Sequence, residues 1–102
     1  MIVYNITVKV EATIAAEWLR WLVDEHAPEM LATGCFWKYQ VLHLFEQDDE
    51  DGPTYAIQYF AHTPADYQDY LTHYATGLQK KVAARWSDRL VSFSTAMQVV
   101  GG

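Results

Sequence analysis

The 102-residue sequence has little cysteine, little positive charge and no long apolar run, and each absence narrows what the protein can be. The single cysteine, Cys35, excludes an internal disulfide and a cysteine-rich metal site. No stretch of about 20 apolar residues is available to span a membrane, and no signal-peptide pattern is present. We therefore expect a soluble protein without a membrane partner, in the reducing environment of the cytoplasm.

Positive charge is scarce, with seven Lys and Arg residues against 13 Asp and Glu residues and a formal net charge of -6. Such a chain repels phosphate backbones and gains little from counterion release, so we expect no nucleic-acid partner. The one basic cluster contains Lys80, Lys81, Arg85 and Arg89. It falls where a helix should end, so its cations complement the helix dipole. An anion site is the alternative.

Metal-ligand motifs are also missing. His26, His43, His62 and His73 form no close metal-binding spacing. The acidic run 48–51 resembles part of a calcium-binding loop, but Gln47 and Gln58 would replace its first and last ligands. We expect a solvated hairpin tip there, and neither a metal site nor a cofactor.

Apolar residues make up 51% of the chain, and their spacing indicates the fold. Alternation with period two predicts strands over Ile2–Val10, Cys35–Phe45, Thr54–His62 and Leu90–Val100, and a period of 3.6 predicts helices over Ile14–Ala32 and Pro64–Arg85. This order is typical of the α+β, ferredoxin-like βαββαβ fold, with a four-stranded antiparallel sheet and two helices on one face. We expect residues 1–102 to form a single domain.

Local signals place the helix ends. Thr13 and Thr63 are candidate N-caps, the second followed by proline in the first helical position. Pro28 should kink or restart the first helix, and Gly34 should end it. Gly77 is expected to bend or break the second helix.

His26 is the candidate functional residue, because Trp18, Leu22 and His26 follow at four-residue steps on one helix face. Near a helix end, carbonyl dipoles would raise the pKa of its imidazole. In a pocket that also contains Tyr4 or Tyr59, His26 would bind a polar ligand group or move a proton. A structural histidine bonded to the loop is the alternative. Tyrosines of the second helix could likewise orient a ligand or simply pack.

Four segments carry a resemblance to a known family: YNITVKV at 4–10, EWLRWLVDEHAPEMLATGCF at 17–36, EQDDEDGPTYAIQYF at 46–60 and ADYQDYLTHYA at 65–75. The sequence resembles a family of short bacterial proteins of unassigned function. The resemblance implies membership of the dimeric α/β-barrel group, whose ferredoxin-like units pair through their sheets. That group includes cofactor-independent monooxygenases, haem-degrading enzymes, isomerases and effector-binding domains, and the haem-ligand context is not recognisable here.

Three functional hypotheses follow. The first is a homodimer, paired through the sheet face, in which Tyr4, Trp18, Leu22, His26 and Tyr59 hold a small aromatic or apolar ligand between sheet and helices. The second is a cofactor-independent monooxygenase- or isomerase-like enzyme with His26 as the catalytic base. The third is a structural dimerisation module, joined by aromatic residues such as Trp37 and Tyr39. Nothing in the sequence decides whether a reaction is catalysed.

Overall fold

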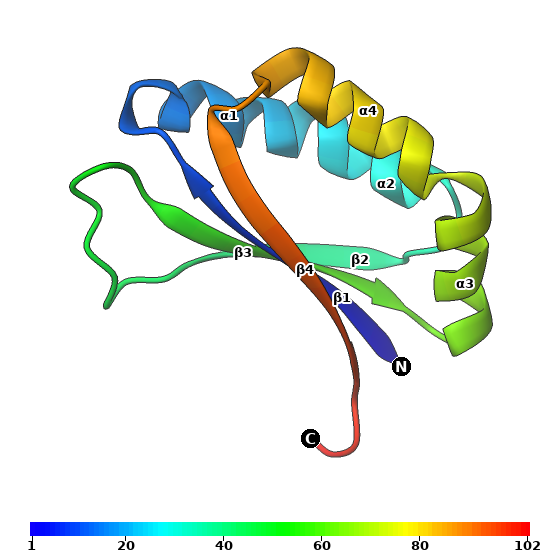
Figure 1. Cartoon of the computed structure of the whole chain (residues 1–102). Coiled ribbons are helices and arrows are strands. Elements are labelled where there is room, and N and C mark those ends of the chain that lie inside the picture. Colours follow the sequence, from blue (N-terminus) through cyan, green and yellow to red (C-terminus); the bar gives the residue numbers. More distant parts are fainter.

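A computed structural model describes all 102 residues, and in it one antiparallel sheet carries a layer of helices on one face (Figure 1). The strands lie in the order β2-β3-β1-β4. Their bounds are β1 Ile2–Val10, β2 Lys38–His43, β3 Thr54–Ala61 and β4 Leu90–Gln98. The ferredoxin-like α+β fold expected from the sequence is confirmed.

Two helical arms form the covering layer (Figure 1). The first follows β1 and comprises the 3-10 turn η1 Ala12–Ile14, α1 Ala15–Trp21, the π-helical turn η2 Leu22–His26 and α2 Ala27–Ala32. The second follows β3 and comprises α3 Pro64–His73 and α4 Ala75–Trp86. Helices of both arms present Trp18, Met30, Tyr70 and Trp86 to the core.

β1 lies inside the sheet and separates two different faces. Tyr4, Val8 and Val10 are buried under the helices, whereas Asn5 and Lys9 lie on the face that no helix covers. The strict alternation of side chains along a strand produces this separation. We call the uncovered surface the open face.

The first arm changes from a π-helical turn to α-helix beside Pro28, and the restart predicted there is confirmed. Ala27 N–H donates to the carbonyl of Leu22 five residues earlier, the π-helical pattern, and α-helix resumes at Ala27. The wider π-helical turn accommodates the proline ring and the loss of the hydrogen bond that Pro28, which has no N–H, cannot donate. The expected cap at Thr13 is wrong: α1 has no side-chain cap, and the Thr13 hydroxyl instead accepts a hydrogen bond from Arg89.

The second arm begins as predicted, because the Thr63 hydroxyl accepts a hydrogen bond from Asp66 N–H at 3.1 Å. The break between α3 and α4 falls at Tyr74, where φ is -126°. The break expected at Gly77 is therefore misplaced by three residues, and Gly77 lies inside α4. A single glycine lowers helix stability but does not have to end a helix.

β2 begins three residues later than predicted. Cys35 and Phe36, expected in the strand, instead lie in the preceding turn with both side chains in the core. Gly34 ends the first arm with φ +80°, as expected for a left-handed helix stop.

The basic cluster on and after α4 contacts carboxylates on and before the first arm. Lys81 bonds Glu29 at 2.7 Å, and Arg85 bonds Glu17 at 2.9 Å. Arg89, just before β4, lies 3.7 Å from Glu11, just after β1. The first two of these exposed pairs link the two arms, and three of the four cations have partners within the chain.

Candidate functional site

A cavity of about 350 Å³ lies between the sheet and the helices. Its floor is formed by β1 and β4, and its roof by α4 together with residues of the first arm. The side chains around it that bear polar groups are Tyr4, His26, Tyr70, Gln79, Ser87, Ser92 and Ser94. No Lys, Arg, Asp or Glu lines it.

The cavity exists because the residues of β4 that face the helices are small. Ser92 pairs with Val8 and Ser94 with Ile6, so both serines project to the helix side of the sheet. Larger apolar residues of β4, including Phe93, alternate with them. Because a serine fills far less volume than the buried side chains of β1 and β3, α4 and β4 do not close against each other.

His26 lies at the end of the π-helical turn and is only 8% exposed. Its ring stacks on Trp21, with centroids 4.8 Å apart and planes at 13°. Burial lowers the pKa of His26 from its ordinary value of 6.5, although Glu29 opposes the shift. The pKa rise expected from a helix end is wrong, because the helix continues through α2 and the imidazole is taken out of water.

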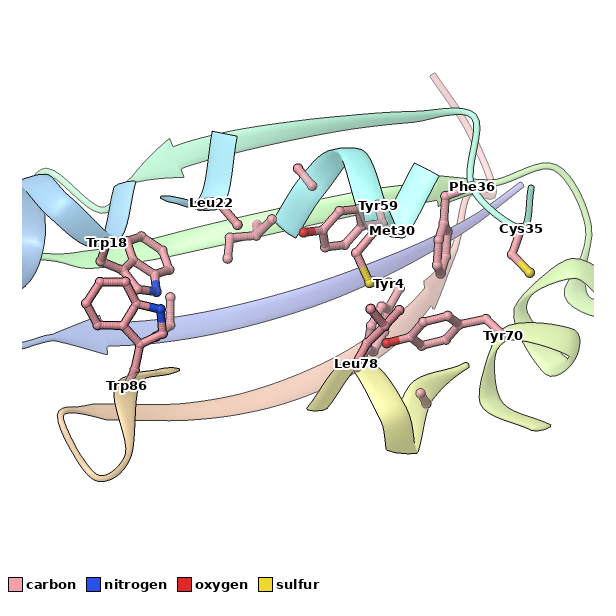
Figure 2. Close-up of a cluster of buried hydrophobic side chains, with 14 of the residues drawn as sticks. Tyr4, Trp18, Leu22, Met30, Cys35, Phe36, Tyr59, Tyr70, Leu78 and Trp86 are labelled. Carbon is pink, nitrogen blue, oxygen red and sulfur yellow. The ribbon is translucent and has the colours of Figure 1, made fainter. Parts of the chain in front are cut away.

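Tyr4 and Tyr70 approach the cavity from opposite layers. Their rings are 5.5 Å apart, and Figure 2 shows Tyr70 reaching from α3 toward Tyr4 on β1. Burial, with the neighbouring Tyr4, raises the pKa of Tyr70 above its ordinary value. The phenol therefore stays protonated at neutral pH and remains able to donate a hydrogen bond.

A second cavity of about 60 Å³ adjoins the first. Trp18, Trp21 and Leu22 line it, and His26 lines both cavities. Of the five residues expected to bind a ligand, Tyr4 and His26 thus border the large cavity, and Trp18 and Leu22 the small one.

Tyr59, the fifth, lines neither cavity. It is fully buried in the core beside Phe36, and its hydroxyl has no hydrogen-bond partner (Figure 2). Burial raises its pKa above the ordinary value. Tyr59 lies on β3, between β1 and β2 in the sheet, and this position keeps it away from the cavity.

Ser87 was not anticipated from the sequence. It is the only non-glycine residue with positive φ, at +55°, and lies in the turn between α4 and β4 at the cavity wall. Arg89 N–H donates to the Trp86 carbonyl and closes this turn. Ser87 caps the C-terminus of α4, where a positive φ is common, and it lies at the wall of the cavity.

The other histidines lie away from the cavity. His43 contacts Asp49 of the hairpin tip at 2.8 Å, and His73 contacts Asp69, four residues earlier on α3, at 3.5 Å. His62 stacks on Trp37 with 5.1 Å between ring centroids. No group of three or more His, Cys, Asp or Glu side chains is arranged to hold a metal ion.

The buried Cys35 thiol contacts Asp69 at 3.5 Å. Burial raises its pKa above the ordinary value, with the Asp69 carboxylate adding to the rise, so the thiol is not activated as a nucleophile. The cavity thus offers neutral hydrogen-bonding groups and one neutral imidazole, but no thiolate and no charged side chain.

This fold places the chain among ferredoxin-like proteins, and three solved structures resemble it over nearly their whole length. A dimeric ferredoxin-like protein from an uncultured marine organism has a TM-score of 0.74 and 11% identity, covering 99% of this chain and 96% of its own. A proposed antibiotic biosynthesis monooxygenase from Deinococcus radiodurans has a TM-score of 0.68 and 16% identity, covering 100% and 95%. A mutant of SnoaB, a cofactor-independent oxygenase from Streptomyces nogalater, has a TM-score of 0.68 and 14% identity, covering 99% and 95%.

The chain itself belongs to the family described as Domain of unknown function (DUF4286), which matches residues 1–100. No curated protein sequence matches it. None of its helices has the length and apolar character needed to cross a membrane. At these identities the solved structures establish the fold alone.

Proposed function

We propose that the protein is a cytoplasmic homodimer in which each protomer binds a small uncharged ligand with an aromatic or apolar body. One observation carries the proposal: the cavity of about 350 Å³ beside His26, lined by apolar side chains and by polar groups that are all neutral. Its volume lies in the range of small-molecule sites. The lone, buried Cys35 suits a reducing compartment.

The lining selects against charged ligands. A carboxylate or ammonium group inside the cavity would lose its hydration without gaining an ionic partner, which is costly in a largely apolar space. Hydroxyl, carbonyl or amide groups of a ligand can instead bond Tyr4, Tyr70 or the neutral ring of His26. Both the shape and the polarity therefore favour a neutral, mainly apolar molecule.

Dimerisation through the open face is supported by large apolar side chains that remain exposed there. Val91 is 73% exposed, and Leu42 and Met97 are each more than 40% exposed. The structurally similar ferredoxin-like protein from the marine organism is dimeric. A second copy covering this face would remove these side chains from water.

The ligand proposal is tested by thermal-shift titration with 2-naphthamide and 2-naphthoate, two compounds of one shape that differ in charge at pH 7.5. We expect 2-naphthamide to raise the melting temperature, and we expect the apparent affinity of 2-naphthoate in the same titration to be at least ten-fold weaker. Ser94→Phe should fill the cavity and abolish the shift, whereas the matched variant Ser94→Ala should keep it. A shift that survives in Ser94→Phe would place binding elsewhere and overturn the proposal.

A second candidate is a cofactor-independent oxygenase or isomerase. The favouring observation is His26 itself, whose pKa is lowered by burial so that it is an unprotonated base at neutral pH. Compounds that bind in the titration would be assayed for oxygen consumption and for conversion by mass spectrometry. If His26→Ala binds them and turns them over as the wild type does, this candidate is eliminated.

A further inference from the structure

A row of polar side chains crosses the open face through all four strands. The pairing of the strands places Gln40 beside Gln58, Gln58 beside Asn5, and Asn5 beside Thr95. All of them belong to the alternate set that projects away from the helices. We call Gln40, Gln58, Asn5 and Thr95 the polar row.

Hydrogen bonds join most of this row. Gln40 Nε2 donates to Gln58 Oε1 at 2.7 Å, and Gln58 Nε2 donates to Asn5 Oδ1 at 3.3 Å. Asn5 Nδ2 then donates to the Thr7 hydroxyl at 3.1 Å. Each of these amides has two N–H groups and uses one, so every side chain keeps bonding capacity toward whatever covers the face.

The neighbouring rows are mainly apolar. On one side the row consists of Phe60, Val3 and Met97, with Lys38 at its end on β2. On the other side it consists of Leu42, Ala56, Thr7 and Phe93. The polar row is therefore a single hydrophilic line between two mainly apolar bands.

The distribution of charged residues indicates which kind of partner covers this face. None of the 13 Asp and Glu residues lies in a strand. The only charged residues on the open face of this acidic chain are therefore Lys9 and Lys38. The acidic hairpin loop, residues 46–51, extends from the end of the sheet opposite Lys38 (Figure 1). Two copies of the chain can approach through the open face without bringing carboxylates together.

We infer that a second copy packs on the open face with the two-fold axis along the polar row, which fixes the register of the pair. This inference rests on the proposed homodimer. The axis places Gln58 opposite the same residue of the other copy. It also sets the exposed Met97 against the exposed Phe93, and turns each acidic loop toward the Lys38 end of its partner.

The register follows from the alternation of bands. A shift by one row, about 7 Å along the strands, would press the amides of each copy onto the apolar band of the other. Their remaining donors and acceptors would then be buried without partners, which is unfavourable. With the rows facing each other, amides meet amides and the mainly apolar rows meet each other.

A charge-swap experiment tests this arrangement. Gln58→Glu and Gln58→Lys are prepared separately, and the dimer dissociation constant is measured by equilibrium sedimentation at pH 7.5. Because each variant places like charges on the axis, we expect each dimer to be at least ten-fold weaker than that of the wild type. Mixed in equal amounts, the two should form a heterodimer that native mass spectrometry detects in preference to either homodimer.

The same changes at Gln68, exposed on α3, provide the control and should leave dimerisation unchanged. Circular dichroism of each variant checks that it folds. Undiminished homodimers of the Gln58 variants, or a mixture that does not pair, would overturn the register while leaving the dimer intact. A wild type that stays monomeric at all concentrations would instead remove the proposed homodimer itself, and the inference with it.

Discussion

The surroundings of His26 give this one residue an influence on stability that depends on pH. Its folded-state pKa lies below that of the unfolded chain, because burial against Trp21 disfavours the charged imidazolium. The unfolded chain therefore binds more protons as pH falls through the range below 6.5. By linkage, the stability contribution of the neutral ring is complete above that pH and decreases below it.

We predict that the free energy of unfolding decreases between pH 7.5 and pH 5.5, with a His26 contribution of at most about 1.4 kcal/mol per pH unit. His26→Phe, which retains an aromatic ring against Trp21, should show a smaller decrease. Urea unfolding of both proteins at several pH values measures the difference. Equal pH slopes for the two would show that His26 is not the titrating group.

At the residue scale, the sequence identified His26 and its helical neighbours, because positions four apart share a face. It gave the wrong sign for the pKa of His26, since a local pattern does not reveal how much of a ring the tertiary structure covers. The sequence also contains no indication of the positive φ at Ser87, because this conformation is usually predicted from glycine or asparagine and not from serine.

At the scale of elements, three glycines have three different functions. A Cβ atom on Gly52, where φ is +140°, would lie 1.8 Å from the carbonyl oxygen of Val10. At Gly34, with φ +80°, the same atom would meet nothing within 4 Å. Gly77 lies within α4 and has neither a positive φ nor a neighbour at that distance.

Replacing each glycine by alanine should therefore give three distinct results. Gly52→Ala should destabilise the protein by about 2 kcal/mol or more, because it combines backbone strain with a collision against β1. Gly34→Ala should cost about 1 kcal/mol through strain alone. Gly77→Ala should stabilise α4 by about 1 kcal/mol. Urea unfolding compares the three, and a Gly52 variant no weaker than the Gly34 variant would contradict the close contact.

The elements themselves were largely predictable. Period and capping signals located every strand, the start of α3 and the restart of the first helix beside Pro28, but the break expected at Gly77 occurs at Tyr74. Alternation along β4 showed two faces without showing which one meets the helices. The pairing of Ser92 with Val8 determines that, and with it the cavity.

At the scale of the whole molecule, the open face determines the behaviour of the protein with concentration. If a second copy covers it, the folded dimer is favoured by mass action and the melting temperature should rise with protein concentration. Met97→Asp introduces a carboxylate on this face, at a site 41% exposed in the single chain. We predict that this variant folds as a monomer and melts at a temperature independent of concentration.

Differential scanning calorimetry over a hundred-fold range of concentration measures this effect, with sedimentation as a second readout. Thr72→Asp on the helix layer is the control, because that surface is distant from the open face. Concentration dependence that persists in Met97→Asp would move the dimer interface to another surface.

The sequence by itself determined the order of the elements, their amphipathic faces and the ferredoxin-like fold, because these depend on periodicity and on signals between near neighbours in the chain. Only the tertiary structure decided that Ser92 and Ser94 lie beneath α4, that Tyr59 is withdrawn into the core and that His26 is kept neutral. Volume, burial and register depend on residues far apart in the sequence, and these are the properties that form the cavity.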